Sequence, residues 1–159
     1  MSLEKAKNHL TKFGLEGRIK EFDVSSATVA LAAEALGTEE ARIAKSLSFM
    51  GPDSPILIIA AGDAKVNNAK YRAEFGIKAR MLPFESVEEL IGHGVGGVCP
   101  FGINTGVKVY LDESLKRFDI VYPAAGTASS AVELSIDELE KASESLKWVN
   151  VCVIPEDNA

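Results

Sequence analysis

The sequence predicts an α+β domain around one mixed β-sheet, curled or closed into a barrel and flanked by helices. Helical and strand-like segments follow one another without the regular β–α–β period of a parallel sheet. Residues 55–61 are apolar throughout, as in a central strand buried on both faces. With 159 residues, 47% of them hydrophobic, the chain can build one ordinary core, so residues 1–159 are expected to form a single domain.

The helices are predicted from their end signals and their apolar spacing. Thr28 precedes an alanine-rich segment that Gly37 ends, and Ser135 with Glu138 forms a capping box. Ser2 precedes apolar residues at helical spacing, and Gly14 follows them. The expected helices are residues 3–13, 29–36, 39–44, 67–75, 85–91 and 136–143, with a helical turn at 113–118.

The strands are predicted from alternating or continuous apolar runs between turn residues. Residues 45–50 alternate, and Gly-Pro-Asp-Ser at 51–54 joins them to the apolar run that follows, as in a hairpin. The expected strands are residues 18–23, 45–50, 55–61, 79–82, 107–112, 119–123, 131–134 and 148–154.

Composition excludes several classes of protein. The net charge of −6 argues against a general nucleic-acid-binding protein, and no DNA partner is expected. No apolar run is long enough to span a bilayer, so no membrane partner is expected. Two cysteines without a secretory signal indicate the reducing cytoplasm, and the scattered histidines and cysteines predict no metal or other cofactor.

A loop at residues 92–102 contains five glycines and Pro100. Such a loop can point backbone N–H groups at an anion or a developing oxyanion, although a structural turn is the alternative. Gly92, Gly94 and Gly97 also have the spacing of the dinucleotide-binding fingerprint. We reject that interpretation because the segment before them reads as a helix rather than a strand.

Three side chains could take part in chemistry. Lys45 lies in an apolar run at a helix-to-strand junction, where it could extend to solvent or hold an anion in a cleft. His93 is more typical of a surface histidine than of a catalytic base. Cys99 has no adjacent base that would activate its thiol, so a buried space-filling role is favoured.

A basic cluster precedes the glycine loop. Its members surround a single acidic residue, Glu74, and are Lys65, Lys70, Arg72, Lys78 and Arg80. Such a cluster can bind a few phosphates although the whole chain is acidic, and an ordinary solvated face is the alternative.

Several segments in order resemble motifs of one family. They begin with Thr28-Val29-Ala30 to Leu36-Gly37 and Ile43-Ala44-Lys45-Ser46-Leu47. The later segments are Gly96-Gly97-Val98-Cys99-Pro100-Phe101-Gly102, Leu111-Asp112-Glu113-Ser114-Leu115 and Ala124-Ala125-Gly126. The set resembles the YbaK/prolyl-tRNA-synthetase-associated editing domain family, over about residues 24–140.

The resemblance implies a mixed β-barrel with flanking helices. It also implies metal-free, trans-acting hydrolysis of the ester that joins a wrong amino acid to tRNA, with tRNA-Pro-type substrates. The implied partners are the acceptor end of aminoacyl-tRNA and prolyl-tRNA synthetase. The implied catalytic residues are Lys45, Gly96, Gly97 and Pro100. The implied substrate-binding residues are Thr28, Ser46, Cys99, Gly102, Asp112 and Gly126. Within the basic cluster, Lys65, Lys70 and Arg72 are the residues expected to contact the tRNA backbone.

The sequence departs from the family pattern at three positions. Ala124 stands where several deacylases of the family have a serine, Ala131 where they have an aspartate, and Ser46 where the family has a threonine. Ser129 and Ser130 lie close to the aspartate position but out of register with it. Two functions therefore remain open: an aminoacyl-tRNA deacylase, or a non-catalytic member that binds an aminoacyl or small-molecule ligand or docks on a synthetase.

Overall fold

The centre of the fold is a mixed sheet in the order β2-β3-β5-β9, within the residues that the computed structural model describes, 2–155. Its strands are β2 Ala44–Met50, β3 Pro55–Ala61, β5 Lys108–Asp112 and β9 Lys147–Val149. β2 and β3 are antiparallel, whereas β3 with β5 and β5 with β9 are parallel. The predicted mixed sheet is therefore confirmed, but it does not close into a barrel over the described residues.

The predicted hairpin and central strand are also confirmed. Residues 51–54 join β2 to β3 in a register that pairs Ala44 with Ala61 and Met50 with Pro55. From Ile56 to Ala61 each residue exposes 2% or less of its surface, because the sheet is covered on both faces.

Shorter strands form two-stranded antiparallel pairs around this sheet. They are β1 Ile19–Glu21 with β7 Ser130–Val132, β4 Lys65–Val66 with β10 Cys152–Val153, and β6 Ile120–Val121 with β8 Leu134–Ser135. The β1–β7 and β4–β10 pairs bring the second half of the chain beside the segments that flank β2 and β3, whereas β6–β8 joins two parts of the second half.

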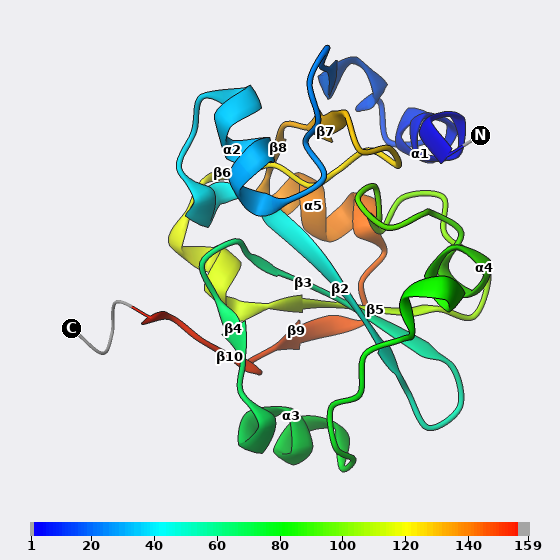
Figure 1. Cartoon of the computed structure of the whole chain (residues 1–159), viewed down its shortest axis with the longest axis vertical. Coiled ribbons are helices and arrows are strands. Elements are labelled where there is room, and N and C mark those ends of the chain that lie inside the picture. The colour runs from blue at the N-terminus through cyan, green and yellow to red at the C-terminus, as the bar shows by residue number, and fades with distance from the viewer. Residues whose placement is uncertain (1, 156–159) are drawn as a thin grey trace.

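The helices end where the capping residues predict. Thr28 accepts a hydrogen bond from the Leu31 amide, Gly37 is left-handed, and Ser135 with Glu138 forms the capping box. The α-helices are α1 Ser2–Thr11, α2 Val29–Leu36, α3 Asn68–Phe75, α4 Val87–Ile91 and α5 Ile136–Ser143. The 3-10 turns are η1 Glu16–Arg18, η2 Glu40–Arg42, η3 Phe84–Ser86 and η4 Glu113–Arg117. In Figure 1, α1, α2 and α5 gather at one end of the central sheet and α3 lies at the other.

Two predicted elements are wrong. The helix expected at 39–44 is only the turn η2, because Ile43 already pairs with Tyr122 and Ala44 begins β2. The strand expected at 79–82 is reduced to one bridge between Met81 and Phe49. Both segments are bound to neighbouring strands by tertiary hydrogen bonds, which outweigh local propensity.

Two further predicted strands are divided. Residues 131–134 contribute to both β7 and β8, and residues 148–154 to both β9 and β10. In the second case the backbone changes partner at Val151, whose N–H donates to the Asp112 carboxylate and whose carbonyl accepts from Asn67. No described helix has the length and apolar character needed to cross a membrane.

Candidate functional site

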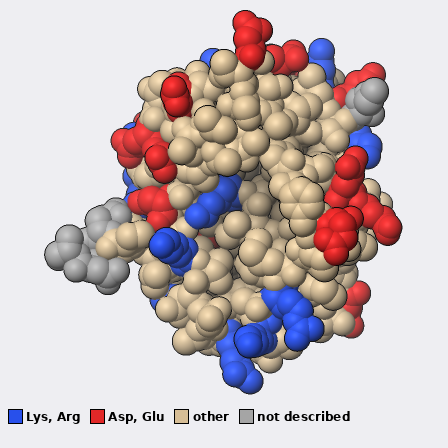
Figure 2. All heavy atoms as spheres, in the orientation of Figure 1, with Lys and Arg blue, Asp and Glu red and all other residues tan. Residues whose placement is uncertain are grey.

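A cavity of about 370 Å³ opens beside the start of β2. Its walls come from the beginning of α2, from β2, from residues 81–87, from the glycine loop and from residues 122–131. The residues that line it are Ser26, Ala27, Thr28, Val29, Ala32, Ile43, Ala44, Lys45, Ser46, Ser48, Met81, Leu82, Phe84, Val87, Val95, Gly96, Val98, Tyr122, Ala124, Ser130 and Ala131. Figure 2 shows a hollow in the middle of this face of the molecule.

Alternation along β2 places small polar side chains at the cavity. Ala44, Ser46 and Ser48 line it, whereas Phe49 packs on Tyr71 in the core at the other face of the strand. The Ser46 hydroxyl oxygen is buried and has no hydrogen-bond partner among the described residues. An unpaired buried hydroxyl is costly, so Ser46 is a group that a ligand in the cavity could satisfy.

Lys45 reaches the wall of the same cavity and is half-buried. Its ammonium donates to the carbonyl of Gly62 at 3.3 Å and to the carbonyl of Ala64. Burial lowers the pKa of Lys45 from its ordinary value of 10.5, while nearby Cys152 and Asp63 act in the opposite direction. The two carbonyl contacts hold the Lys45 ammonium in place beside the cavity.

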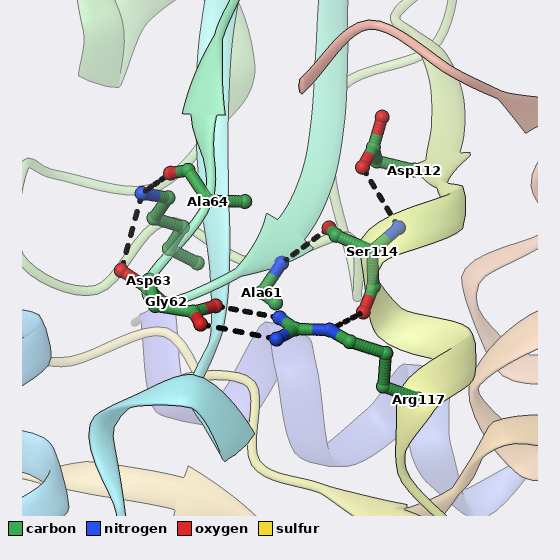
Figure 3. Close-up of polar contacts among 8 residues, drawn as sticks. Ala61, Gly62, Asp63, Ala64, Asp112, Ser114 and Arg117 are labelled. Atoms are coloured by element: carbon green, nitrogen blue, oxygen red, sulfur yellow. Dashed lines mark hydrogen bonds and ion pairs between the residues drawn. The ribbon is translucent and has the colours of Figure 1, made fainter. Parts of the chain in front are cut away.

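The turn that holds Lys45 is itself braced by a polar network (Figure 3). Arg117 donates to both carboxylate oxygens of Asp63, at 2.6 and 3.1 Å, and to the Ser114 carbonyl at 3.0 Å. The Ser114 hydroxyl accepts from the Ala61 amide at 3.1 Å, and Asp112 accepts from the Ser114 amide at 2.9 Å. The network ties the end of β3 to η4.

Asp112 has a structural position in this network. It exposes 1% of its surface, and its second oxygen accepts from the Val151 amide at 2.9 Å. It does not line the cavity beside Lys45, so the expected contact between Asp112 and substrate stays a prediction without geometric support.

The middle of the glycine loop lines the cavity, through Val95, Gly96 and Val98. Gly96 lines it, whereas a Cβ atom at Gly97 would lie 2.5 Å from the backbone of Gly126 and Thr127. The Gly97 amide also donates to the Gly94 carbonyl at 3.0 Å. Gly97 and Gly126 therefore allow two turns to pack together, which is a different use from the expected oxyanion contact.

The C-terminal end of the loop lies outside this cavity. Pro100 and Gly102 line a separate depression of about 590 Å³, together with Lys5 and His9 of α1. Gly102 has a φ of +71°, and a side chain there would meet the Lys5 backbone. The structure thus separates Pro100 and Gly102 from Lys45 and Gly96.

Cys99 and His93 are both enclosed by the loop. Burial raises the pKa of the Cys99 thiol to about 12, and neither residue lines the cavity. His93 is fully buried, and its Nε2 lies 2.6 Å from the Phe101 carbonyl oxygen, so the expected surface position is wrong. Burial lowers the pKa of His93, which favours the neutral ring. A buried thiol of this kind cannot supply the thiolate that nucleophilic catalysis needs.

The two alanines that depart from the family pattern meet at the cavity. Ala124 and Ala131 are bridge partners, and both line it. Ser130 lines it as well, and its hydroxyl lies 2.7 Å from that of Thr127. Thr28, whose hydroxyl caps α2, also lines the cavity.

The basic residues lie outside the cavity. Lys65 and Arg72 are exposed, while Lys70 is half-buried and donates to Asn150 and to the Cys152 carbonyl at 3.2 and 3.1 Å. Lys70 therefore supports the chain near β10. Basic side chains gather on the same face as the hollow, over α3 and the segment that follows it (Figure 2).

The structure thus brings together Thr28, Lys45, Ser46, Gly96, Ala124 and Ala131 as lining residues of one cavity. The cavity also has an apolar rim that was not predicted from the sequence, and it consists of Met81, Phe84 and Val95. An aromatic residue directly after Pro83, outside any strong apolar period, was the signal available in the sequence. Within residues 2–155 no group of histidine, cysteine, aspartate and glutamate has the arrangement of a metal site.

These features define a small α+β domain with a mostly apolar cavity, one fixed cation and one unpaired hydroxyl. A family model for the aminoacyl-tRNA editing domain matches residues 24–142. The chain therefore belongs to the aminoacyl-tRNA editing domain family.

Individual relatives agree with this assignment. The "Uncharacterized protein YwhH" of Bacillus subtilis (strain 168) is 53% identical over 153 residues, which cover 96% of this chain and 98% of that protein. The proline–tRNA ligase of Thermosipho melanesiensis is 33% identical over 80% of this chain but only 22% of the ligase. The chain thus resembles one part of that much longer enzyme.

Solved structures have the same fold. One, described as a "putative trans-editing enzyme for prolyl tRNA synthetase", is 30% identical with a TM-score of 0.85, over 94% of this chain and 96% of that one. Another, "hypothetical protein APE2540", is 27% identical with a TM-score of 0.84, over 94% of this chain and 99% of that one.

Proposed function

We propose that this protein hydrolyses the ester bond between a wrongly attached amino acid and tRNA, acting in trans on tRNA-Pro-type substrates. The observation that carries the proposal is the convergence of the family's motifs at one cavity. Lys45 and Ser46, Gly96, and the alanine at 124 come from distant parts of the sequence and line the same space. The family assignment and the likeness to prolyl-tRNA synthetase support the same substrate class.

The lining of the cavity favours attack by water without a protein base. Among the described residues that line it there is no carboxylate, histidine or cysteine. In the proposed reaction, water attacks the ester carbonyl carbon and the bond from that carbon to the terminal ribose oxygen breaks. The proton released from water passes to the ribose oxygen, with the neighbouring ribose hydroxyl as the carrier, and the products are a free amino acid and tRNA.

Lys45 and Ser46 have separate tasks in this proposal. The positive charge of Lys45 stabilises the negative charge that develops on the ester oxygen, beside a mostly apolar cavity wall. Ser46 donates its unpaired hydroxyl to the substrate and so orients the ester. Gly96, with a φ of +95° and no side chain, lets the loop pack against Ala27 and Ala128 while its backbone lines the cavity.

The cavity wall also suggests the substrate's side chain. Ala124 and Ala131 present methyl groups, and Ile43, Val29 and Leu82 add apolar surface. An apolar aminoacyl side chain fits such a wall, whereas a charged one would lose its hydration without a partner. Because translation takes place in the cytoplasm, the proposal also locates the protein there.

The decisive experiment is a deacylation assay with a panel of mischarged tRNAs. We expect at least one mischarged tRNA-Pro with an apolar amino acid to be hydrolysed, and correctly charged prolyl-tRNA to be spared. Lys45→Ala should lose roughly 10²-fold or more in rate, the scale of one preorganised electrostatic contact. Unchanged ester lifetimes across the panel would contradict a deacylase.

A non-catalytic role is the second candidate. It is favoured by Ala124 and Ala131, which remove polar groups that several deacylases of the family have at this wall. A protein of this kind would bind the aminoacyl end, or dock on prolyl-tRNA synthetase, without hydrolysis. Tight binding of aminoacyl-tRNA combined with no turnover would favour this candidate.

A further inference from the structure

The mouth of the cavity has an apolar rim made of Met81, Phe84 and Val95. Among the described large hydrophobic side chains Phe84 is the most exposed, at 74%, and Met81 and Val95 expose 56% and 52%. All three line the cavity, so they form one patch rather than scattered surface residues. An exposed apolar patch around a cavity indicates a surface that a ligand covers.

Residues 80–82, which include Met81 of the rim, are hydrogen-bonded to β2, the strand that contains Lys45 and Ser46. The amide of Met50 in β2 donates to the Arg80 carbonyl at 2.7 Å, and the amide of Leu82 donates to the Ser48 carbonyl at 3.1 Å. Met81 is the bridge partner of Phe49, which lies three residues along β2 from Ser46. At roughly 3.3 Å per residue, Met81 lies about 10 Å from Ser46 along the direction of β2. This separation is comparable with one nucleoside that carries an aminoacyl group.

Charges on the two sides of the rim differ. Acidic residues follow Phe84 in the chain, at Glu85, Glu88 and Glu89, and all three are exposed. Basic residues precede Met81, at Lys78 and Arg80, and both are exposed. Figure 2 shows acidic side chains over α4 on one side of the hollow and basic side chains over α3 on the other. A phosphate is therefore repelled near Phe84 and attracted towards Arg80.

We infer that Phe84, supported by Met81 and Val95, is a stacking platform for the terminal nucleobase of the tRNA acceptor end. The inference rests on the proposed function for the identity of the nucleic acid. The acceptor end is single-stranded, so its last base is free to stack on an aromatic face. With the base on Phe84, the ribose and its ester extend towards Ser46 and the preceding phosphate lies on the basic side.

The test measures equilibrium binding of an uncharged RNA hairpin that ends in the single strand CCA, by fluorescence anisotropy at fixed salt. Phe84→Ala should weaken binding roughly 5- to 150-fold, as for one stacked base, and Phe84→Tyr should keep most of the affinity. Leu146→Ala is the matched control, because Leu146 is 61% exposed but does not line the cavity, and it should not change the affinity.

A second hairpin, with an abasic residue at the 3′ end, separates stacking from other effects. The wild-type protein should bind it as weakly as Phe84→Ala binds the complete hairpin, and Phe84→Ala should cause no further loss. If Phe84→Ala weakens both hairpins equally, or neither, the stacking platform is wrong.

The outcome is independent of hydrolysis because the hairpin carries no ester. Base-dependent binding through Phe84 without turnover of any mischarged tRNA would support the platform and contradict the deacylase. Turnover of mischarged tRNA together with unchanged binding by Phe84→Ala would contradict the platform alone.

Discussion

Arg117 holds Asp63 through two hydrogen bonds of 2.6 and 3.1 Å, and Asp63 lies between the two residues whose carbonyls accept from Lys45. The pair joins η4 to the turn between β3 and β4, and the guanidinium lowers the pKa of the Asp63 carboxyl. A bidentate arginine fixes both distance and orientation. The position of the Lys45 ammonium therefore depends on a contact made outside the cavity.

The first prediction concerns this contact. Arg117→Lys keeps the positive charge but loses the planar fork, so the turn should hold Lys45 less firmly. We expect kcat for deacylation to fall several-fold, with KM little changed, because Arg117 does not line the cavity. The matched control is Lys147→Met, which breaks the exposed ion pair with Glu74, 2.6 Å long and remote from the cavity, and should leave kcat unchanged. Equal kcat values for Arg117→Lys and the wild type would contradict a positioning role.

The second prediction is a pH dependence that comes from Lys45. Burial lowers its pKa below 10.5, so the charged form is lost at lower pH than in a free lysine. Deacylation should therefore decline on the alkaline side with an apparent pKa below 10.5, after subtraction of uncatalysed ester hydrolysis. Asp63→Asn removes a negative charge that raises this pKa, so the decline should move to still lower pH.

The contribution of Lys45 to the free energy of unfolding should change with pH in the opposite direction to the activity. Between the folded and unfolded pKa values of Lys45 the unfolded chain binds more protons, so the contribution of this residue to stability rises with pH. The alkaline loss of activity can therefore be separated from unfolding. Circular dichroism at each pH measures whether the protein is still folded. An alkaline decline that persists unchanged in Lys45→Met would assign it to another group.

The third prediction concerns the exposed basic residues. If Lys65 and Arg72 contact tRNA phosphates, replacing both with glutamine should flatten the plot of log affinity against log salt by about 1.4 to 1.8 units. Lys7→Gln with Lys141→Gln removes the same charge from exposed positions on α1 and α5 and should leave the slope unchanged. Equal slopes in both double variants would show that Lys65 and Arg72 belong to an ordinary solvated face and do not contact tRNA phosphates.

Local features of this fold were predictable and long-range ones were not. Thr28, Gly37 and the Ser135–Glu138 box act within one turn of chain, so their residue types were sufficient to place helix ends. The parallel pairing of β3 with β5 joins segments almost fifty residues apart, and nothing local specifies it. The isolated bridge between Met81 and Phe49 likewise replaces an expected strand because its partner is a distant strand edge.

In the candidate site as well, the residue types were predictable from the sequence but their placement was not. The sequence indicated Lys45 and Ser46 as neighbours, but only the alternation and pairing of β2 show that the Ser46 hydroxyl is left unpaired at the cavity. Pro100 belongs to the same glycine loop as Gly96, yet the turn between them directs Pro100 towards α1. Proximity in sequence was therefore a poor guide to which loop residues meet the substrate.

The fourth prediction tests the close contact of two turns. In Gly97→Ala the new methyl group would lie 2.5 Å from the backbone of Gly126 and Thr127, which cannot move aside as a flexible side chain can. We expect a loss of about 1–3 kcal/mol in the free energy of unfolding, measured by denaturant titration. Gly17→Ala is the control, because open space surrounds Gly17, and it should change stability by less than about 0.5 kcal/mol. If Gly97→Ala is as stable as the wild type but inactive, Gly97 serves the substrate rather than the packing of the two turns.

The fifth prediction separates function from stability at Ser46. Its hydroxyl is buried without a partner, so Ser46→Ala should keep or raise the free energy of unfolding, by about 1 kcal/mol at most. Deacylation should nevertheless fall by 10-fold or more, because the substrate loses a hydrogen bond that orients the ester. Ser54→Ala is the matched control: its hydroxyl is also buried and unpaired among the described residues, but it lies in the β2–β3 turn outside the cavity. Ser54→Ala should share the effect on stability and keep full activity. A Ser46→Ala variant that is destabilised and still fully active would show that the hydroxyl serves the fold and not the substrate.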